Sequence, residues 1–122
     1  ESLHHSAWQL GYQPEIVWID TEKLEKEPNL INLLKEVKGI IIPQGWGSRG
    51  VEGKIKVCHF ARVNKIPYLG LCFGMQMATI EFARNVLGLK DANTTEANEK
   101  TTNPVIHIMK DQLKFLKEIV KK

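Results

Sequence analysis

Cysteine is scarce in this chain, and a long apolar run is absent. The 122 residues include two cysteines, Cys58 and Cys72, which are too few for a disulfide framework and lack the paired spacing of a zinc site. No apolar stretch approaches the roughly twenty residues of a membrane-spanning helix, and no basic segment leads into the apolar core of a signal peptide. We therefore expect a cytoplasmic, reducing environment, with no bound metal and no membrane partner.

A strong charge of either sign is absent as well. The chain has 17 basic and 14 acidic residues and a net charge of +3, an excess too small to predict a nucleic-acid partner. Part of the excess lies in residues 110–122, which have a basic amphipathic pattern. We expect a helix or tail there whose charged face is solvated, and the alternative for this segment is an anionic membrane surface.

Apolar runs and helical patterns alternate along the chain. The sequence predicts strands at 16–19, 39–43, 66–71 and 105–109, helices at 2–10, 20–24, 30–37, 51–64 and 75–87, and a polar loop at 91–103. Continuous apolar strands between helices are typical of a parallel sheet that is covered on both sides. The predicted fold class is therefore α/β, with a three-layer, mostly parallel sheet, helices on both faces and a single domain.

The most informative stretch is residues 70–74, where a strand pattern ends in Gly-x-Cys-x-Gly and a helix pattern follows at once. In hydrolases of the Gly-x-Ser-x-Gly type this turn presents a nucleophile at the carboxyl end of a strand. Here Cys72 stands in the place of the serine, and Gly70 and Gly74 allow the chain to pass closely over itself. The alternative is a buried cysteine at a glycine-rich strand end. Cys58, inside a helical pattern, is predicted to be a core or half-buried thiol.

A second glycine-rich loop, residues 44–50, follows the strand at 39–43. Ligands of parallel sheets bind at the carboxyl ends of the strands, so this loop and Cys72 are expected to lie together. The backbone N–H groups of Gly45 and Phe73 would hold the oxyanion of an acyl-transfer reaction. Such a reaction also needs a general base, usually a histidine oriented by a carboxylate. No His-x-Glu pair occurs in the chain. All four histidines have the pattern of a surface or partly buried imidazole: His4, His5, His59 and His107.

Three segments carry a resemblance to a known family: residues 39–54, 65–76 and 81–93. The elbow is shared by class I amidotransferases in general. The sequences Arg-Gly-Val-Glu-Gly-Lys at 49–54 and Glu-Phe-Ala-Arg-Asn-Val-Leu at 81–87 are specific to CTP synthases. From about residue 2 to residue 109, the chain therefore resembles the class I glutamine amidotransferase (glutaminase) domain of CTP synthases, which implies a flavodoxin-like fold.

The resemblance also implies a reaction. A cysteine nucleophile hydrolyses L-glutamine through a glutamyl thioester, and the ammonia passes to a separate synthetase domain. That domain uses ATP and magnesium to aminate UTP to CTP, with GTP as activator, in a homo-oligomer of the full-length protein. The glutaminase domain itself needs no cofactor. By matching position, the resemblance implies these roles: Cys72 as nucleophile, Gly45 and Phe73 as oxyanion donors, Gln76 and Glu96 as glutamine contacts, and Arg49 and Glu52 in an activation lid.

The chain departs from the family pattern in three ways. Gln44 stands where the family usually has glycine, so it would strain the oxyanion loop if that position needed a positive φ. The strand that opens the family's domain precedes residue 1. The family's His-x-Glu pair lies beyond residue 109. We therefore expect residues 1–109 to be a partial glutaminase domain and 110–122 to be a segment that does not align.

Two other functions fit parts of the pattern. A catalytically inactive regulatory or interaction domain on the same scaffold would explain Gln44 and the unfamiliar basic segment. A cysteine hydrolase for another substrate, with a base from a second chain, would explain the elbow but not the segments specific to CTP synthases. We expect the 122 residues alone to have negligible glutaminase activity, because the sequence holds a nucleophile without its base.

Overall fold

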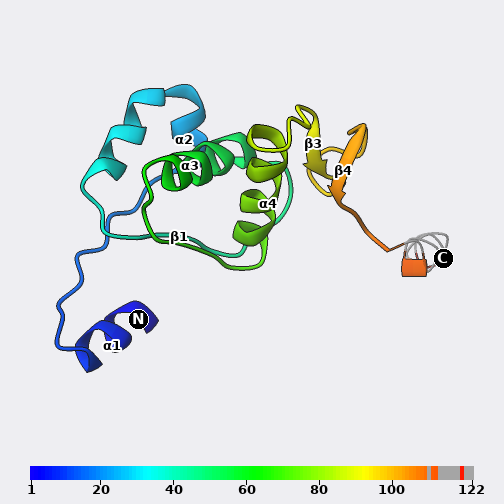
Figure 1. The fold of residues 1–122 in the computed structure, drawn as a ribbon. Coiled ribbons are helices and arrows are strands. Elements are labelled where there is room, and N and C mark those ends of the chain that lie inside the picture. The colour runs from blue at the N-terminus through cyan, green and yellow to red at the C-terminus, as the bar shows by residue number, and fades with distance from the viewer. Residues whose placement is uncertain (110, 113–118, 120–122) are drawn as a thin grey trace.

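The computed structural model describes residues 1–109, 111, 112 and 119 (Figure 1). Its elements are α1 (Ser2–Gln9), α2 (Thr21–Lys26), the 3-10 helix η1 (Pro28–Lys35), β1 (Ile40–Ile42), α3 (Val51–Val63), β2 (Tyr68–Gly70), α4 (Phe73–Asn85), β3 (Ala92–Thr94) and β4 (Asn103–Ile106). From β1 to α4, strands and helices alternate as the sequence predicts. Within the described ranges, no helix is long and apolar enough to cross a membrane.

The strands form two parallel pairs. β1 pairs with β2 in a register that sets Ile40 opposite Tyr68 and Ile42 opposite Gly70. β3 pairs with β4, also in parallel. The crossover between β1 and β2 is α3, as expected for parallel strands. The α/β class and the parallel pairing are therefore as predicted.

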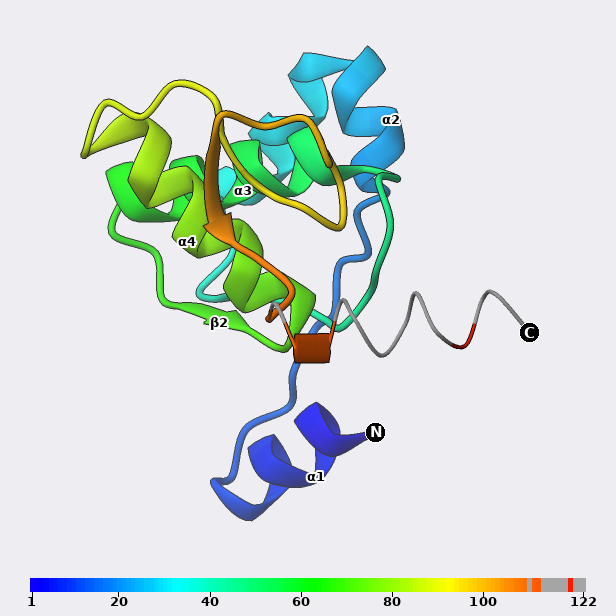
Figure 2. The ribbon, with the colours of Figure 1, turned by 90° about the vertical axis from the view of Figure 1, so that its right-hand side faces the viewer.

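α3 and α4 pack against each other and lie on the same side of the β1–β2 pair (Figures 1 and 2). Ile40 and Ile42 face these helices and are 7% and 4% exposed, whereas Ile41 points the other way and is 36% exposed. Leu69 of β2 is 52% exposed. The sequence predicts helices on both faces of the sheet. In the described part of the chain, α3 and α4 cover one face of the β1–β2 pair.

The helix pattern at 75–87 predicts a buried face formed by its apolar positions: Met75, Ala78, Thr79, Phe82, Ala83, Val86 and Leu87. The buried face of α4 differs from this prediction. Phe73, Met77 and Ile80 are at most 1% exposed, and the charged Glu81 is 2% exposed. Most of the predicted apolar stripe lies outward, with exposed fractions of 46% to 63%: Met75, Phe82, Val86 and Leu87. The prediction was wrong because α4 begins at Phe73, inside the elbow, and because an ion cluster hides the carboxylate of Glu81 in the interface with α3.

Residues 16–19 do not form the predicted strand. They belong to an irregular segment that joins α1 to α2 (Figure 1). Val17 is 51% and Trp18 is 85% exposed, while Ile19 packs against the core. An apolar run becomes a strand only beside a partner strand, and none of the described strands pairs with this segment.

Two further segments differ in detail from the prediction. Residues 28–35 form a 3-10 helix, in which Leu34 is buried and Leu33 is 52% exposed. The predicted polar loop at 91–103 contains β3, which is fully buried. Its polar residues are satisfied locally, since the Asn93 side chain accepts the Thr94 N–H at 2.9 Å. Polar residues that are hydrogen-bonded to their neighbours can be buried, so the polar sequence of this segment does not reveal a buried strand.

Candidate active site

Cys72 occupies a strained turn between β2 and α4. Its φ and ψ are 52° and −102°, a conformation that non-glycine residues rarely adopt, and the residue is exposed. A Cβ on Gly70 would lie 2.6 Å from the carbonyl carbon of Gly74. A Cβ on Gly74 would overlap the carbonyl oxygen of Ile42. The predicted elbow is therefore present, and both glycines are required by close backbone contacts.

The glycine-rich loop lies beside the elbow. A Cβ on Gly45 would lie 3.7 Å from Cδ1 of Phe73, which is itself buried at the start of α4. Neither the Gly45 nor the Phe73 N–H donates to a backbone carbonyl among the described residues. Two amides with unused donors thus lie in the elbow and in the loop beside it, and the N-terminal end of α4 adds a partial positive charge.

Gln44 does not strain this loop through its backbone. Among the described non-glycine residues, positive φ occurs at Lys65 and Cys72. Gln44 is also exposed, so its side chain is not buried in the loop. The positive φ of the loop is at Gly47 and Gly50, with values of 77° and 64°.

Glu96 reaches the glycine-rich loop from the segment after β3. Its Oε1 accepts the N–H of Gly47 at 2.9 Å, a contact between residues 49 positions apart in the sequence. Glu96 is otherwise exposed, and its own N–H donates to Thr94 Oγ1 at 3.3 Å. The structure therefore brings Glu96 to the loop that contains Gly45, as a shared site requires.

Gln76 lies one helical turn after Cys72. Its N–H donates to the Cys72 carbonyl at 3.2 Å. The Oε1 atom of its side chain is buried and has no hydrogen-bond partner among the described residues. Buried acceptors are normally paired, so this oxygen can accept a hydrogen bond from a further donor.

Arg49 and Glu52 take part in two separate ion pairs at the start of α3. Arg49 Nη2 lies 2.6 Å from Glu22 Oε1, and Glu52 Oε2 lies 2.8 Å from Arg84 Nη1. Arg49 and Glu52 are exposed, which limits the energy of each pair. These contacts attach the N-terminus of α3 to α2 and α4. The structure does not bring either residue into contact with Cys72.

Sequence reasoning did not identify Lys54 or Tyr68 beside the site. Lys54 Nζ donates to the Arg49 carbonyl at 2.9 Å and lies 5.8 Å from the centroid of the Phe73 ring. Burial lowers its pKa below the usual range of lysine, although Glu25 and Glu22 oppose the shift. Tyr68 donates its hydroxyl to the Gly74 carbonyl at 2.7 Å. The signal available in the sequence was the closeness of both residues to glycines, since Lys54 follows Gly53 and Tyr68 lies two positions before Gly70.

None of the four histidines bonds to Cys72. His59 Nδ1 lies 2.9 Å from Glu81 Oε1, and His107 Nδ1 lies 3.1 Å from Thr95 Oγ1. The remaining two, His4 and His5, lie next to Trp8 on α1. The prediction that these imidazoles lie at the surface or partly buried agrees with their positions in the described chain.

Glu81 is the centre of a buried ion cluster between α3 and α4. Arg62 donates Nη2 to Glu81 Oε1 at 2.7 Å, and Asn85 donates to the same oxygen at 3.1 Å. Burial acts to raise the pKa of this carboxyl, but hydrogen bonds from Arg62, His59 and Asn85 outweigh burial and lower the pKa to about 2. Glu81 is thus a structural anion, and His59 is committed to it.

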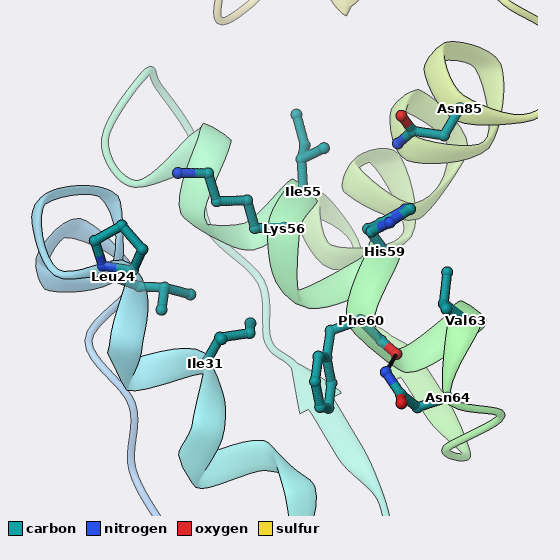
Figure 3. A pocket seen from close by; sticks show the side chains of 10 residues that line it. Leu24, Ile31, Ile55, Lys56, His59, Phe60, Val63, Asn64 and Asn85 are labelled. Carbon is teal, nitrogen blue, oxygen red and sulfur yellow. Dashed lines mark hydrogen bonds between the residues drawn. The ribbon is translucent and has the colours of Figure 1, made fainter.

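A pocket of about 540 Å³ lies on another side of the molecule, between α2, η1 and α3 (Figure 3). Leu24, Ile31 and Ile55 contribute apolar side chains, and Lys56 and His59 contribute polar ones. None of the residues predicted for the site lines it. Within the described part of the chain, no group of three or more His, Cys, Asp or Glu side chains could hold a metal ion. The candidate active site is therefore the elbow with its flanking loop.

The comparisons with known proteins agree with this geometry. A family model described as glutamine amidotransferase class-I matches residues 1–120. The CTP synthase of Sulfolobus acidocaldarius is 53% identical over 116 residues, which are 95% of this chain and 22% of that protein. The CTP synthase of Herpetosiphon aurantiacus is 54% identical over 114 residues, which are 93% of this chain and 21% of that protein. The chain thus spans about a fifth of the length of these relatives.

A solved structure supports the same assignment. The glutaminase domain of Trypanosoma brucei CTPS, solved with bound acivicin, matches with a TM-score of 0.79 and 38% sequence identity. The match covers 90% of this chain and 46% of that one. With an elbow cysteine, a flanking glycine-rich loop and a family model that matches nearly all its residues, the chain belongs to the glutamine amidotransferase class-I family.

Proposed function

We propose that this chain is the part of a CTP synthase glutaminase domain that carries the nucleophile, and that Cys72 attacks the side-chain carboxamide of L-glutamine. The observation that carries the proposal is the strained, exposed position of Cys72 at the start of α4. Strain of this kind persists only where the surrounding structure over-determines it. A nucleophile needs such a position, whereas a buried structural thiol does not.

The amides beside Cys72 support acyl transfer. The thiolate sulfur forms a bond to the carboxamide carbon, and the carbonyl oxygen becomes an oxyanion between the N–H groups of Gly45 and Phe73. Collapse of this intermediate breaks the C–N bond and, once the nitrogen has taken up a proton, releases ammonia and leaves a glutamyl thioester. Water then releases glutamate and restores the thiol. Removal of one oxyanion donor typically costs about 10²–10³ in rate.

We assign recognition of the substrate to Glu96 and Gln76. The carboxylate of Glu96, which bonds to the Gly47 N–H at 2.9 Å, would accept the α-ammonium group of glutamine. The unpaired Oε1 of Gln76 would accept a further N–H of the substrate. Arg49 and Glu52, at the start of α3, would transmit activation by GTP through their ion pairs with α2 and α4.

The remaining steps belong to the rest of the parent protein. We propose that a synthetase domain takes up the ammonia and uses ATP and magnesium to aminate UTP, in a homo-oligomer of full-length chains. Because none of the four histidines bonds to Cys72 in the described structure, we also propose that the 122 residues alone turn glutamine over at a negligible rate. Glutamine turnover at the rate of an intact glutaminase domain, abolished by Cys72→Ala, would contradict this second proposal.

Labelling with acivicin, a glutamine-analogue electrophile, tests the proposed nucleophile. We expect one adduct on Cys72, located by peptide mass analysis, that 10 mM glutamine suppresses and 10 mM glutamate suppresses less. Cys58 is the internal control, since burial raises its pKa to about 11 and keeps it a thiol. Glu96→Gln should weaken protection by glutamine and leave alkylation by iodoacetamide unchanged.

An inactive regulatory or interaction domain on the same scaffold is the second candidate, favoured by the absence of a histidine at Cys72 in the described structure. The same labelling separates the two candidates. If Cys72 reacts with iodoacetamide but not with the glutamine analogue, the thiol is accessible and the glutamine site is not formed. That result would favour the inactive domain.

A further inference from the structure

We propose that Tyr68 is a positioning residue for Cys72, and that the buried thiol of Cys58 orients the Tyr68 hydroxyl. The inference rests on the proposed function, because it assigns Tyr68 to the same nucleophile. Neither residue touches the reacting atoms. Their effect acts through the backbone of the elbow.

The Tyr68 hydroxyl forms a hydrogen bond that joins the chain before Cys72 to the chain after it. Tyr68 lies on β2, four positions before Cys72, and its Oη donates to the carbonyl of Gly74, two positions after Cys72, at 2.7 Å. The chain folds back on itself in between, with Gly70 in close contact with Gly74. One side-chain hydrogen bond therefore joins the strand to the first turn of α4 across the strained residue.

The other hydrogen bonds around the elbow are backbone bonds. The Leu71 N–H donates to Ile42 O at 2.9 Å, the Gly74 N–H donates to Leu71 O at 2.9 Å, and the Gln76 N–H donates to Cys72 O at 3.2 Å. These bonds depend little on side-chain identity. Among the described residues, Tyr68 supplies the side-chain hydrogen bond to this turn. The position of Cys72 is thus sensitive to one hydroxyl group.

Cys58 explains why this hydroxyl points toward the elbow. Cys58 lies on α3, is 4% exposed, and donates its S–H to Tyr68 Oη at 3.3 Å. Because the Tyr68 oxygen accepts the hydrogen bond from Cys58, its O–H group is oriented to donate to the Gly74 carbonyl. Burial raises the pKa of the Cys58 thiol to about 11, although the hydrogen bond to Tyr68 opposes the shift, and burial also raises the pKa of Tyr68. Both groups therefore remain donors at neutral pH.

A positioning role predicts a change in selectivity, defined as the rate of Cys72 labelling by acivicin divided by the rate of labelling by iodoacetamide. A change in stability alone would not alter this ratio. A glutamine analogue reacts only from an oriented complex, in which a displacement of the sulfur by about 1 Å can cost 10²-fold in rate. Iodoacetamide needs only an accessible thiolate. Tyr68→Phe removes the hydroxyl and retains the ring, so it should lower the rate of Cys72 labelling by acivicin about tenfold and change the iodoacetamide rate less than about twofold.

The experiment measures both labelling rates in the 122-residue chain for Tyr68→Phe, Cys58→Ala, Cys58→Ser and the control Tyr12→Phe. Tyr12 is 71% exposed and far from the elbow in sequence. We expect a loss of selectivity in Tyr68→Phe, a smaller loss in Cys58→Ala, restoration in Cys58→Ser, which keeps an O–H donor, and no change in Tyr12→Phe. Equal selectivity in wild type and Tyr68→Phe would overturn the proposal.

A second measurement keeps this proposal separate from the proposed function. If the wild-type chain shows no preference for acivicin, the proposed function fails. The positioning role is then decided by hydrogen exchange at the amides of Phe73 to Met77. Exchange at least about tenfold faster in Tyr68→Phe than in Tyr12→Phe would support it, and equal exchange would overturn it.

Discussion

Residues 66–71, which lead into the elbow, and residues 16–19, which precede α2, both have the apolar pattern of a strand. Only the first of these segments contains a strand in the structure. Within residues 66–71, Tyr68–Gly70 form β2 beside β1 and lead into α4. Residues 16–19 remain irregular, with Trp18 85% exposed. The difference lies in their neighbours, since β2 has a partner strand and two helices over it. An apolar run specifies a strand only together with the elements that cover it.

The largest effect on this difference should come from Gly74→Ala. The new Cβ would overlap the Ile42 carbonyl oxygen, which belongs to β1 and cannot move without disrupting the β1–β2 pair. We expect a loss of about 4 kcal/mol in the free energy of unfolding, measured by urea denaturation. Gly39→Ala is the matched control, because its Cβ would lie 3.7 Å from Pro67 O, an ordinary contact. Equal denaturation midpoints for the two variants would show that the elbow is not tightly packed.

Glu81→Gln should have the next largest effect. Glu81 is 2% exposed and anchors α4 to Arg62 of α3, so loss of its charge should cost about 2–3 kcal/mol. Its pKa of about 2 lies below the ordinary value of 4.5. Its contribution is therefore complete above pH 4.5 and is lost as the pH falls through 2.

Acid titration of stability checks this assignment. The wild-type chain should lose more stability than Glu81→Gln between pH 4.5 and pH 2. Glu36→Gln, at an exposed position, should follow the wild type. If Glu81→Gln and the wild type lose stability in parallel, the carboxylate of Glu81 is not the group that titrates.

Asp20→Ala probes the boundary between the two regions. Asp20 caps α2, and its carboxylate accepts the N–H groups of Glu22 and Lys23 at 2.9 and 3.3 Å. Loss of this cap should cost about 1 kcal/mol. Asp20→Asn, which retains a capping oxygen, should restore most of the loss. A change below 0.3 kcal/mol in the alanine variant, on the scale of about 1 kcal/mol for such caps, would mean that α2 does not depend on the cap.

Trp18→Ala should have the smallest effect. With 85% of Trp18 exposed, the change in the free energy of unfolding should stay within about 0.5 kcal/mol. A tryptophan in a buried strand would instead cost about 3–5 kcal/mol. Met77→Ala, at a position with 0% exposure, is the reference for a core loss of about 2–5 kcal/mol. A similar loss in both variants would place Trp18 in a packed strand.

Short-range constraints made the site predictable. The elbow follows from a Gly-x-Cys-x-Gly pattern, because the steric reasons for Gly70 and Gly74 act within a few residues. The helix predicted at 20–24 depends on equally local signals, and in the structure Asp20 caps it. The order of strands and helices from β1 to α4 follows from apolar runs and helical periodicity.

Long-range contacts were not predictable from these patterns. The burial of Glu81 depends on Arg62 and His59, which lie on another helix. The exposure of Val17 and Trp18 depends on which strands lie beside them. The contact between Glu96 and Gly47 joins residues 49 positions apart, and neither local pattern nor the resemblance to a family predicts it.

Residue-resolved hydrogen exchange on the wild-type chain compares the two regions most directly. Amides of α4 such as Met77 and Ile80 should exchange at least about 10³-fold more slowly than in an unstructured peptide, because they lie in a helix packed on the core. The amides of residues 16–19 donate to no backbone carbonyl of the described chain and should exchange within about tenfold of the unstructured rate. Comparable protection in both segments would contradict the conclusion that the elbow is ordered while the earlier apolar run is not.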